Sequence, residues 1–210
     1  MFGWLRRAPS PRMEQRSRVS NALADYPPYT PPAWDADPDT IEHATYTKFF
    51  LENRDDRLAA FRTFLVKFDV APDLDDAGLR AVSAWCPLYL DLLVDGLGSD
   101  TLSSAYHEFE APWVGPLLGL NPIFDLGVYC GECVLLRNPR LEWQCLRGPE
   151  HFVAHQIVGQ KNQHFFEPVR WTYVMSKNIF NEKDPRYAAI PGPRTKEDEL
   201  YRHIQWQAIA

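Results

Sequence analysis

The spacing of apolar residues is helical over most of the chain and becomes alternating towards its C-terminal part. Apolar residues recur every three or four positions up to about Val66, which predicts a first helix that Asp39 or Thr40 caps. The same spacing predicts a second helix over residues 73–92 and a short third helix over residues 99–109. The first half of the chain is therefore expected to be helical.

The next predicted helix, from Pro122 to about Arg137, is apolar on nearly all sides. Asn121 before Pro122 is a typical helix start, with the asparagine as N-cap and the proline at the first helical position. A helix without a polar face is usually covered from several sides. We therefore expect this segment to be a buried central helix.

Apolar and polar residues alternate after residue 139, which predicts short strands. A first strand covers 141–145, a second covers 151–158, and a third is expected within 165–175, with alternate residues of 169–175 on one face. Thr195 is then expected to cap a final helix. Helices followed by a small antiparallel sheet and a helix predict an α+β fold.

The first 38 residues differ from the rest because they hold seven of the 18 prolines. Proline removes a backbone donor and restricts the residue before it, so we expect an extended or flexible arm ahead of one domain over 39–210. Three aromatic residues, Tyr26, Tyr29 and Trp34, are interleaved with these prolines and predict a strap pinned onto the domain. A proline-rich ligand for another protein is the alternative.

The net charge of −6 is unevenly distributed along the chain. Residues 1–20 contain five arginines and one glutamate, so they carry about +4 and the other 190 residues about −10. An acidic body repels phosphates, which argues against nucleic acid and favours a protein partner with a basic surface. The arginine-rich start is expected to be a solvated tail.

The sequence also predicts where the protein resides. It contains no run of 18 or more apolar residues, so no membrane span is expected. The start lacks the order of charges and apolar residues typical of a secretory signal, which indicates a cytoplasmic protein. The four cysteines lie in apolar surroundings and are expected to be reduced and buried.

The predicted central helix contains two glycines and two carboxylates at helical spacing. Gly127 and Gly131 share one face, where the absence of side chains lets another segment approach closely. Asp125 and Glu132 share a different face, and a carboxylate in such an apolar helix is expected to pair with an arginine or a backbone amide. We interpret these four residues as organising the core, with catalysis by Glu132 as the alternative.

A series of cysteines and histidines begins within the same predicted helix and continues beyond it. Its residue types are compatible with zinc: Cys130, Cys133, Cys145 and His151, with His155 four positions further on. The context disfavours a metal, because the paired cysteines lie within a helix and His151 and His155 would lie far apart along a strand. No cofactor is therefore expected.

The sequence lacks the signatures of common catalytic centres, including a P-loop, a nucleophile elbow and an H-E-x-x-H motif. Tyr106, His107 and Glu108 are expected at the surface. Tryptophans at a surface would mark a binding face, so Trp143 and Trp171 join the three front-end aromatics as candidate binding residues, although core positions are the simpler interpretation.

The pattern Gly127-Val-Tyr-Cys-Gly-Glu132, followed by a strand with Trp143 and by Pro-Val-Arg-Trp at 168–171, resembles a group of small uncharacterised bacterial α+β domains. Some of these resemble immunity proteins of toxin systems. The resemblance covers about residues 95–180 and implies no catalytic residues.

Three functions remain open on the sequence. The first is a cytoplasmic, non-enzymatic protein-binding module of bacterial type, for which the resemblance implies an immunity-like role. The second is a small enzyme or zinc protein that uses Glu132 and the cysteine–histidine string. The third is a structural subunit that docks through residues 1–38.

Overall fold

Helices dominate the computed structural model, which describes residues 10–31, 43–147, 153–159, 165–186 and 195–209. The elements in chain order are α1 (Pro11–Leu23), α2 (His43–Val66), α3 (Asp76–Tyr89), the 3-10 turn η1 (Leu90–Leu92), α4 (Asp100–His107), the 3-10 turn η2 (Gly115–Leu117), α5 (Leu120–Arg137), β1 (Glu142–Arg147), β2 (Val153–Val158), β3 (Phe165–Phe166), α6 (Pro168–Lys183) and α7 (Glu199–Ile209). The expected α+β fold, with helices packed on a small sheet, is confirmed.

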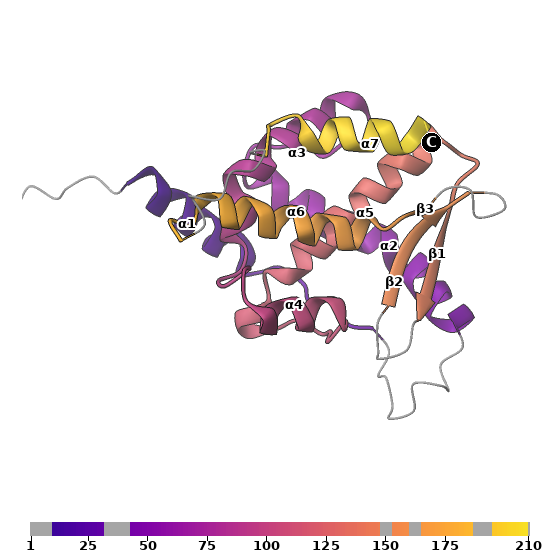
Figure 1. Ribbon diagram of the computed structural model, residues 1–210, viewed down its shortest axis with the longest axis horizontal. Coiled ribbons are helices and arrows are strands. Elements are labelled where there is room, and N and C mark those ends of the chain that lie inside the picture. Colours follow the sequence, from indigo (N-terminus) through magenta and orange to yellow (C-terminus); the bar gives the residue numbers. More distant parts are fainter. Residues whose placement is uncertain (1–9, 32–42, 148–152, 160–164, 187–194, 210) are drawn as a thin grey trace, which may run out of the picture.

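The sheet is antiparallel, with the strands in the order β1-β2-β3. Cys145 of β1 pairs with His155 of β2, and Ile157 of β2 pairs with Phe166 of β3. Helix α2 packs against β1 and helix α6 against β2, so the sheet is joined to the helical body through these two helices. Figure 1 shows the sheet at one end of the molecule and α1 at the opposite end.

Helix α5 is the central helix that the sequence predicts. It packs against α2, α6 and α7, and every residue from Leu120 to Gly131 is buried. Gly127 allows the closest approach, because a Cβ atom added there would lie 2.5 Å from the Cα atom of Val169 on α6. The missing side chain at this position therefore brings the backbones of α5 and α6 together.

Replacement of Gly127 by alanine is expected to lower the free energy of unfolding by about 1–3 kcal/mol, because the new methyl group would push against the α6 backbone. This loss would outweigh the better helix propensity of alanine. Urea denaturation of wild type and variant measures the change. The control is Asn178→Ala on the exposed face of α6, which should shift stability by less than about 0.5 kcal/mol. Equal stability of Gly127→Ala and wild type would contradict the close approach.

The expectation of an extended or flexible front segment is wrong for residues 11–23, which form helix α1. Ser10 caps the helix through a bond from the amide of Met13, and Pro11 follows at the first helical position, where proline fits well. In the part of the expected solvated tail that the structure describes, three arginines of α1 stay 38–62% exposed and also pair with aspartates of the acidic body. The pairs are Arg12 with Asp91, Arg16 with Asp95 at 3.8 Å, and Arg18 with Asp69 at 2.6 Å.

The strap predicted after this helix is present over residues 24–31. Tyr26 and Tyr29 are buried, and the amide of Tyr29 donates to the side chain of Asn121 at 2.7 Å. Trp34, the third aromatic residue of the predicted strap, lies outside the described residues. The described part of the front segment is thus bound to the protein's own body.

Helix α5 begins two residues earlier than predicted, at Leu120, and Asn121 does not cap it. The Asn121 side chain is buried and donates to the carbonyl oxygen of Trp113 at 2.8 Å while it accepts from the strap. Its bonds to distant backbone groups replace the capping bond that the local pattern favours. Asn121 therefore joins the strap to the loop before α5.

The prediction of a third strand is confirmed only at Phe165–Phe166 and is wrong for residues 169–175, which belong to helix α6. Pro168 occupies the first turn of that helix, and Val169, Thr172, Tyr173 and Ser176 are buried at helical spacing. Thr195 does not cap α7 directly, since its amide and hydroxyl both donate to Glu182 of α6 at 2.8 Å. Within the described ranges, no helix combines the length and apolar character needed to cross a membrane.

Candidate functional site

The carboxylate of Asp125 lies at the centre of a buried polar cluster between α2, α5 and the strap. Arg57 of α2 donates to both of its oxygens, from Nε at 2.8 Å and from Nη2 at 2.6 Å, and Tyr26 donates its hydroxyl proton to Oδ2. Burial raises the pKa of Asp125, and the bonds from Arg57 and Tyr26 oppose that shift. Arg57 also donates to the carbonyl oxygen of Pro27 at 3.0 Å, so one arginine fixes both helix and strap.

Glu132 has partners of the kind that the sequence predicts. Trp143 of β1 donates from Nε1 to Oε1 of Glu132 at 2.6 Å, and Nε of Arg54 lies 3.3 Å from the same oxygen. Gly131 leaves the space that the Trp143 ring occupies, because any Cβ atom there would overlap the ring. These contacts join α2, α5 and β1, which is the organising role expected of Gly131 and Glu132.

The four cysteines are free and buried. Burial raises the pKa of the Cys133 and Cys145 thiols to about 12 and that of Cys130 well above its usual range, which keeps them protonated at neutral pH. His151 lies outside the described residues. Across the described ranges, no group of three or more histidine, cysteine and carboxylate side chains is arranged to hold a metal ion.

The candidate binding residues divide into buried and surface positions. Tyr26, Tyr29 and Trp143 are buried in the core, so the structure corrects their interpretation as a binding surface. Tyr106 is corrected in the same way: its side chain is 3% exposed and it donates to the carbonyl oxygen of Val169 at 3.0 Å. Trp171 is only half-buried and reaches the surface.

Trp171 belongs to a cluster that we call the aromatic face, formed by Phe166, Trp171, Val174, His203 and Trp206. The rings of Trp171 and His203 are stacked, with their centroids 4.1 Å apart and their planes 3° apart. The ring centroid of Trp206 lies 6.1 Å from that of His203, and the centroid of Phe166 lies 6.2 Å from that of Trp171 and 5.3 Å from that of His203. Helices α6 and α7 thus present a preformed aromatic surface beside β3.

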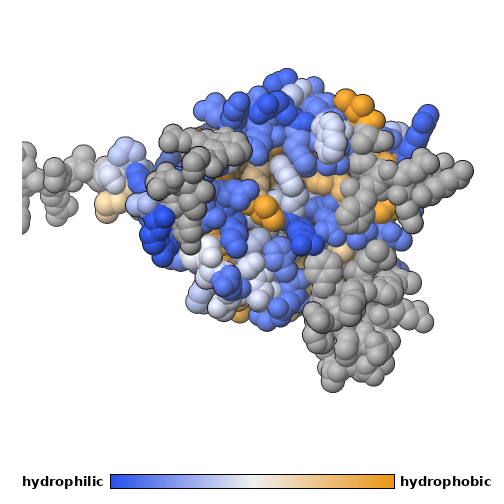
Figure 2. Space-filling view, in the orientation of Figure 1, coloured by the Kyte–Doolittle hydropathy of each residue, from blue (hydrophilic) through white to orange (hydrophobic). Residues whose placement is uncertain are grey.

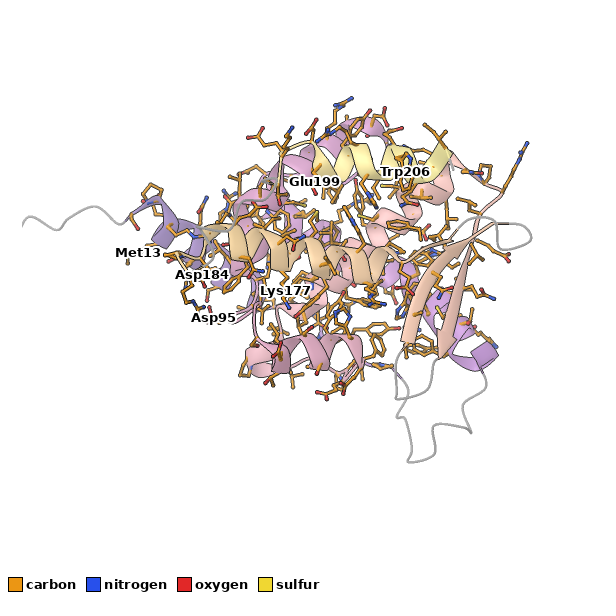
Figure 3. All side chains as sticks on the ribbon, viewed as in Figure 1. Met13, Asp95, Lys177, Asp184, Glu199 and Trp206 are labelled. Atoms are coloured by element: carbon orange, nitrogen blue, oxygen red, sulfur yellow. The ribbon has the colours of Figure 1, made fainter. Side chains whose placement is uncertain are left out.

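The aromatic face is open to solvent at two places. Trp206 is 63% exposed and Val174 on α6 is 42% exposed. Figure 3 shows Trp206 on α7, and Figure 2 shows apolar patches interrupting the hydrophilic surface over α6 and the end of α7. Partial burial lowers the pKa of His203 to about 4, so the stacked ring is neutral at pH 7.

Sequence reasoning offered Trp171 as a surface candidate, with a core position as the simpler interpretation, and did not place His203 and Trp206 beside it. The available signal was the spacing in α7, where Leu200 and Ile204 form the buried face. His203 and Trp206 are three positions apart and fall outside that face. Two exposed acidic residues, Glu197 and Asp198, come directly before α7.

Comparisons of this chain with protein-family models, with curated proteins and with solved structures find no match.

Proposed function

We propose that this protein is a non-enzymatic protein-binding module whose partner covers the aromatic face. The observation that supports the proposal best is the exposure of Trp206 beside the rigid Trp171–His203 stack. Tryptophan is enriched among the residues that dominate binding energy at protein interfaces, and an ordered aromatic surface loses little conformational entropy on binding. Single exposed apolar residues are common on monomeric proteins, but a contiguous exposed patch marks an interaction site, and the aromatic face groups Trp206 with Trp171 and His203.

The proposed partner has a basic surface next to an apolar one. The chain's net charge of −6 supports this choice, and Glu197 and Asp198 add exposed carboxylates just before α7. Opposite charges around an apolar contact accelerate association and fix its orientation. The resemblance to toxin-immunity proteins adds a narrower proposal, in which the partner is a toxin that the module inhibits by covering it.

The test begins with tagged wild-type protein in native lysate at low salt. A stoichiometric partner is identified, purified and titrated against wild type and Trp206→Ala by calorimetry. We expect Trp206→Ala to weaken binding by about 30-fold or more, as for the loss of a dominant interface residue. The exposed position of Trp206 should leave the fold unchanged, which circular dichroism checks.

Met13→Ala is the matched control. Met13 is 60% exposed, close to the 63% of Trp206, but lies on α1 at the far end of the molecule (Figure 3). This variant should bind as tightly as wild type. Unchanged affinity of Trp206→Ala would contradict the proposed face, and the absence of any stoichiometric partner would contradict the module itself.

A further inference from the structure

Helix α1 is held on the body by its arginines more than by apolar packing. Of its 13 residues, Val19 and Ala22 alone are buried. The helix lies at the end of the molecule opposite the sheet (Figure 1), and Figure 3 shows Met13 of α1 and Asp95 at that end. A helix of this length has little stability of its own in water. Polar contacts with the body therefore decide whether α1 stays in place.

Arg18 occupies a site with three kinds of contact at the C-terminal end of α2. Its Nε donates to the carbonyl oxygen of Lys67 at 2.9 Å, and its Nη2 donates to Oδ2 of Asp69 at 2.6 Å. The guanidinium carbon lies 5.2 Å from the centre of the Phe68 ring, which is a cation–π contact. Carbonyl oxygens at the end of a helix also carry partial negative charge. This end of α2 is thus built to hold a guanidinium group.

Asp69 is unfavourable for its own backbone position, because its φ of 61° lies in the left-handed region. Its amide donates to the carbonyl oxygen of Val66 at 3.0 Å. The amide of Val70 donates to that of Leu65 at 3.2 Å, which completes a Schellman motif whose left-handed residue is usually glycine. A carboxylate after the end of a helix is also disfavoured by the helix dipole. The ion pair with Arg18 offsets both costs, which indicates that Asp69 serves the docking of α1.

Arg12 occupies a similar site at the end of α3. Its guanidinium donates to the carbonyl oxygen of Leu88 at 3.4 Å and to the carboxylate of Asp91. The buried Asp91 also accepts from Nζ of Lys183 on α6 at 2.9 Å. Departure of Arg12 would therefore leave this carboxylate with a counter-charge, and release of α1 avoids the large cost of an unpaired buried charge.

The connection between α1 and the strap is suited to act as a hinge. Ala24 and Asp25 are exposed, whereas the strap is fixed from Tyr26 onwards by the hydroxyl bond of Tyr26 and the amide bond of Tyr29. A cavity of about 210 Å³ lies between the end of α1, the strap and α2. The close packing that holds most of a protein interior in place is therefore missing beside this connection.

The contacts that hold α1 are accessible to water and ions. The side chains of Arg12, Arg16 and Arg18 remain partly exposed in their ion pairs. The exposed Lys67 adds one further contact, from Nζ to the carbonyl oxygen of Ala22 at 3.1 Å. Exposed ion pairs contribute little individually and are weakened by salt. We therefore expect α1 to open at a free energy well below that of global unfolding.

We propose that α1 is a releasable latch, which opens as a unit about Ala24 and Asp25 while the strap and the body stay folded. Competition for its ion pairs releases it. Release uncovers the ring of Phe68, which is 6% exposed in the closed state, and frees the carboxylate of Asp69. The inference does not depend on the aromatic face, which lies on α6 and α7.

Hydrogen exchange of the full chain at neutral pH, measured for single amides by NMR, tests the latch. The amides of α1 should exchange at least about tenfold faster than those of α5, which open only when the body unfolds. An increase of NaCl from about 0.1 M to about 1 M shortens the Debye length from about 10 Å to about 3 Å. Exchange in α1 should then accelerate by about fivefold or more, whereas α5 should keep its protection.

Asp69→Asn is the sharpest variant, because asparagine tolerates the same positive φ but has no charge. It should accelerate exchange throughout α1 by about threefold to fivefold, which corresponds to the loss of one exposed ion pair. Arg18→Gln should have the same effect from the other side of the pair. Both residues are largely exposed, so the body should remain folded in each variant.

Arg202→Gln is the matched control, because Arg202 forms an exposed ion pair with Asp198 at 3.0 Å near the start of α7. It should leave exchange in α1 unchanged. Equal exchange rates in α1 and α5, no acceleration by salt, or no acceleration in both Asp69→Asn and Arg18→Gln would overturn the latch. A gradient along α1 that leaves Ala22 as protected as α5 would show fraying from the helix start and would also overturn it.

Discussion

Replacement of Arg57 by methionine is expected to lower the free energy of unfolding by about 3–5 kcal/mol, the typical effect of breaking a buried ion pair. Methionine keeps the apolar length of the side chain but leaves the carboxylate of Asp125 without its counter-charge. Asp125 is fully buried, and Tyr26 would be its one remaining hydrogen-bond donor among the described residues. The folded state would then hold either an uncompensated charge or a proton taken up at an energetic cost.

Arg62→Met is the matched control on the same helix. Arg62 pairs with Asp73 at 3.6 Å, but both side chains are more than 60% exposed. Solvent screens such a pair, so its loss should change stability by no more than about 1 kcal/mol. Urea denaturation of both variants at neutral pH gives the comparison directly.

The double variant Arg57→Met, Asp125→Leu tests whether the unpaired charge of Asp125 causes the stability loss of Arg57→Met. Removal of both charges should recover a large part of the stability that Arg57→Met loses, because no charge is then left buried. Arg57 also bonds Pro27, so the strap should remain more accessible to proteases in both variants. Equal losses for Arg57→Met and Arg62→Met would show that the buried cluster does not stabilise the fold.

The carboxylates of α5 show how far local spacing predicts tertiary structure. Asp125 and Glu132 are seven residues apart, which places them on one helix face, and both meet arginines of α2. Arg54 and Arg57 are three apart and match that spacing. The sequence could predict that each carboxylate needs a partner, but not that one neighbouring helix supplies both.

The errors have a common physical origin in contacts between distant segments. Alternation at 169–175 predicted a strand, whereas the close approach at Gly127 holds the same residues as a helix against α5. Helix α1 was missed because its few apolar residues give almost no periodic signal, and its arginines bind aspartates far along the chain. Spacing within a segment contains no information about such partners.

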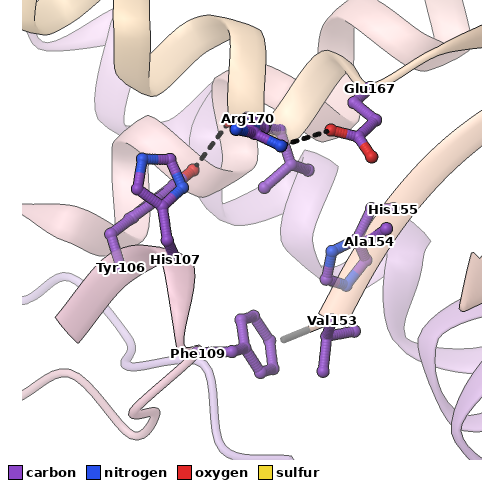
Figure 4. A pocket seen from close by; sticks show the side chains of 9 residues that line it. Tyr106, His107, Phe109, Val153, Ala154, His155, Glu167 and Arg170 are labelled. Carbon is purple, nitrogen blue, oxygen red and sulfur yellow. Dashed lines mark hydrogen bonds and ion pairs between the residues drawn. The ribbon is translucent and has the colours of Figure 1, made fainter. Parts of the chain in front are cut away.

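Trp171 and His155 also differ in how far the sequence alone reveals their surroundings. Trp171 was identified as a surface candidate because a tryptophan is informative by residue type alone. His155 lines a small pocket between α4, β2 and α6 (Figure 4) and contacts Tyr46 of α2, and no motif connects these elements. His155 entered the sequence reasoning only as an unsuitable zinc ligand, since its environment is created by folding.

His155 should make the folded state sensitive to acid. Burial lowers its pKa from about 6.5 to about 3, whereas the unfolded chain keeps the ordinary value. Below pH 6.5 the unfolded state therefore binds a proton that the folded state does not, so the free energy of unfolding decreases as the pH falls from 6.5 towards 3. Above 6.5 the ring is neutral in both states and contributes no pH dependence.

Between pH 6.5 and about pH 4.5, His155 is expected to lower the free energy of unfolding by about 2–3 kcal/mol, at about 1.4 kcal/mol for each pH unit. Urea denaturation of wild type and His155→Gln at both pH values measures it. Glutamine keeps a polar side chain but does not titrate, so the variant should lose less stability than wild type by that amount. The losses caused by carboxylates are common to both proteins and cancel in the difference.

The groups around His155 determine whether this difference can be assigned to its ring. Tyr46 contacts Nε2, Cys145 pairs with its backbone across the sheet, and the pocket adds His107, Glu167 and Arg170. Burial also lowers the pKa of His107, but this side chain is only half-buried, so His107→Gln should reduce the acid sensitivity less than His155→Gln. Parallel loss of stability in wild type and His155→Gln would mean that protonated His155 is tolerated in the fold.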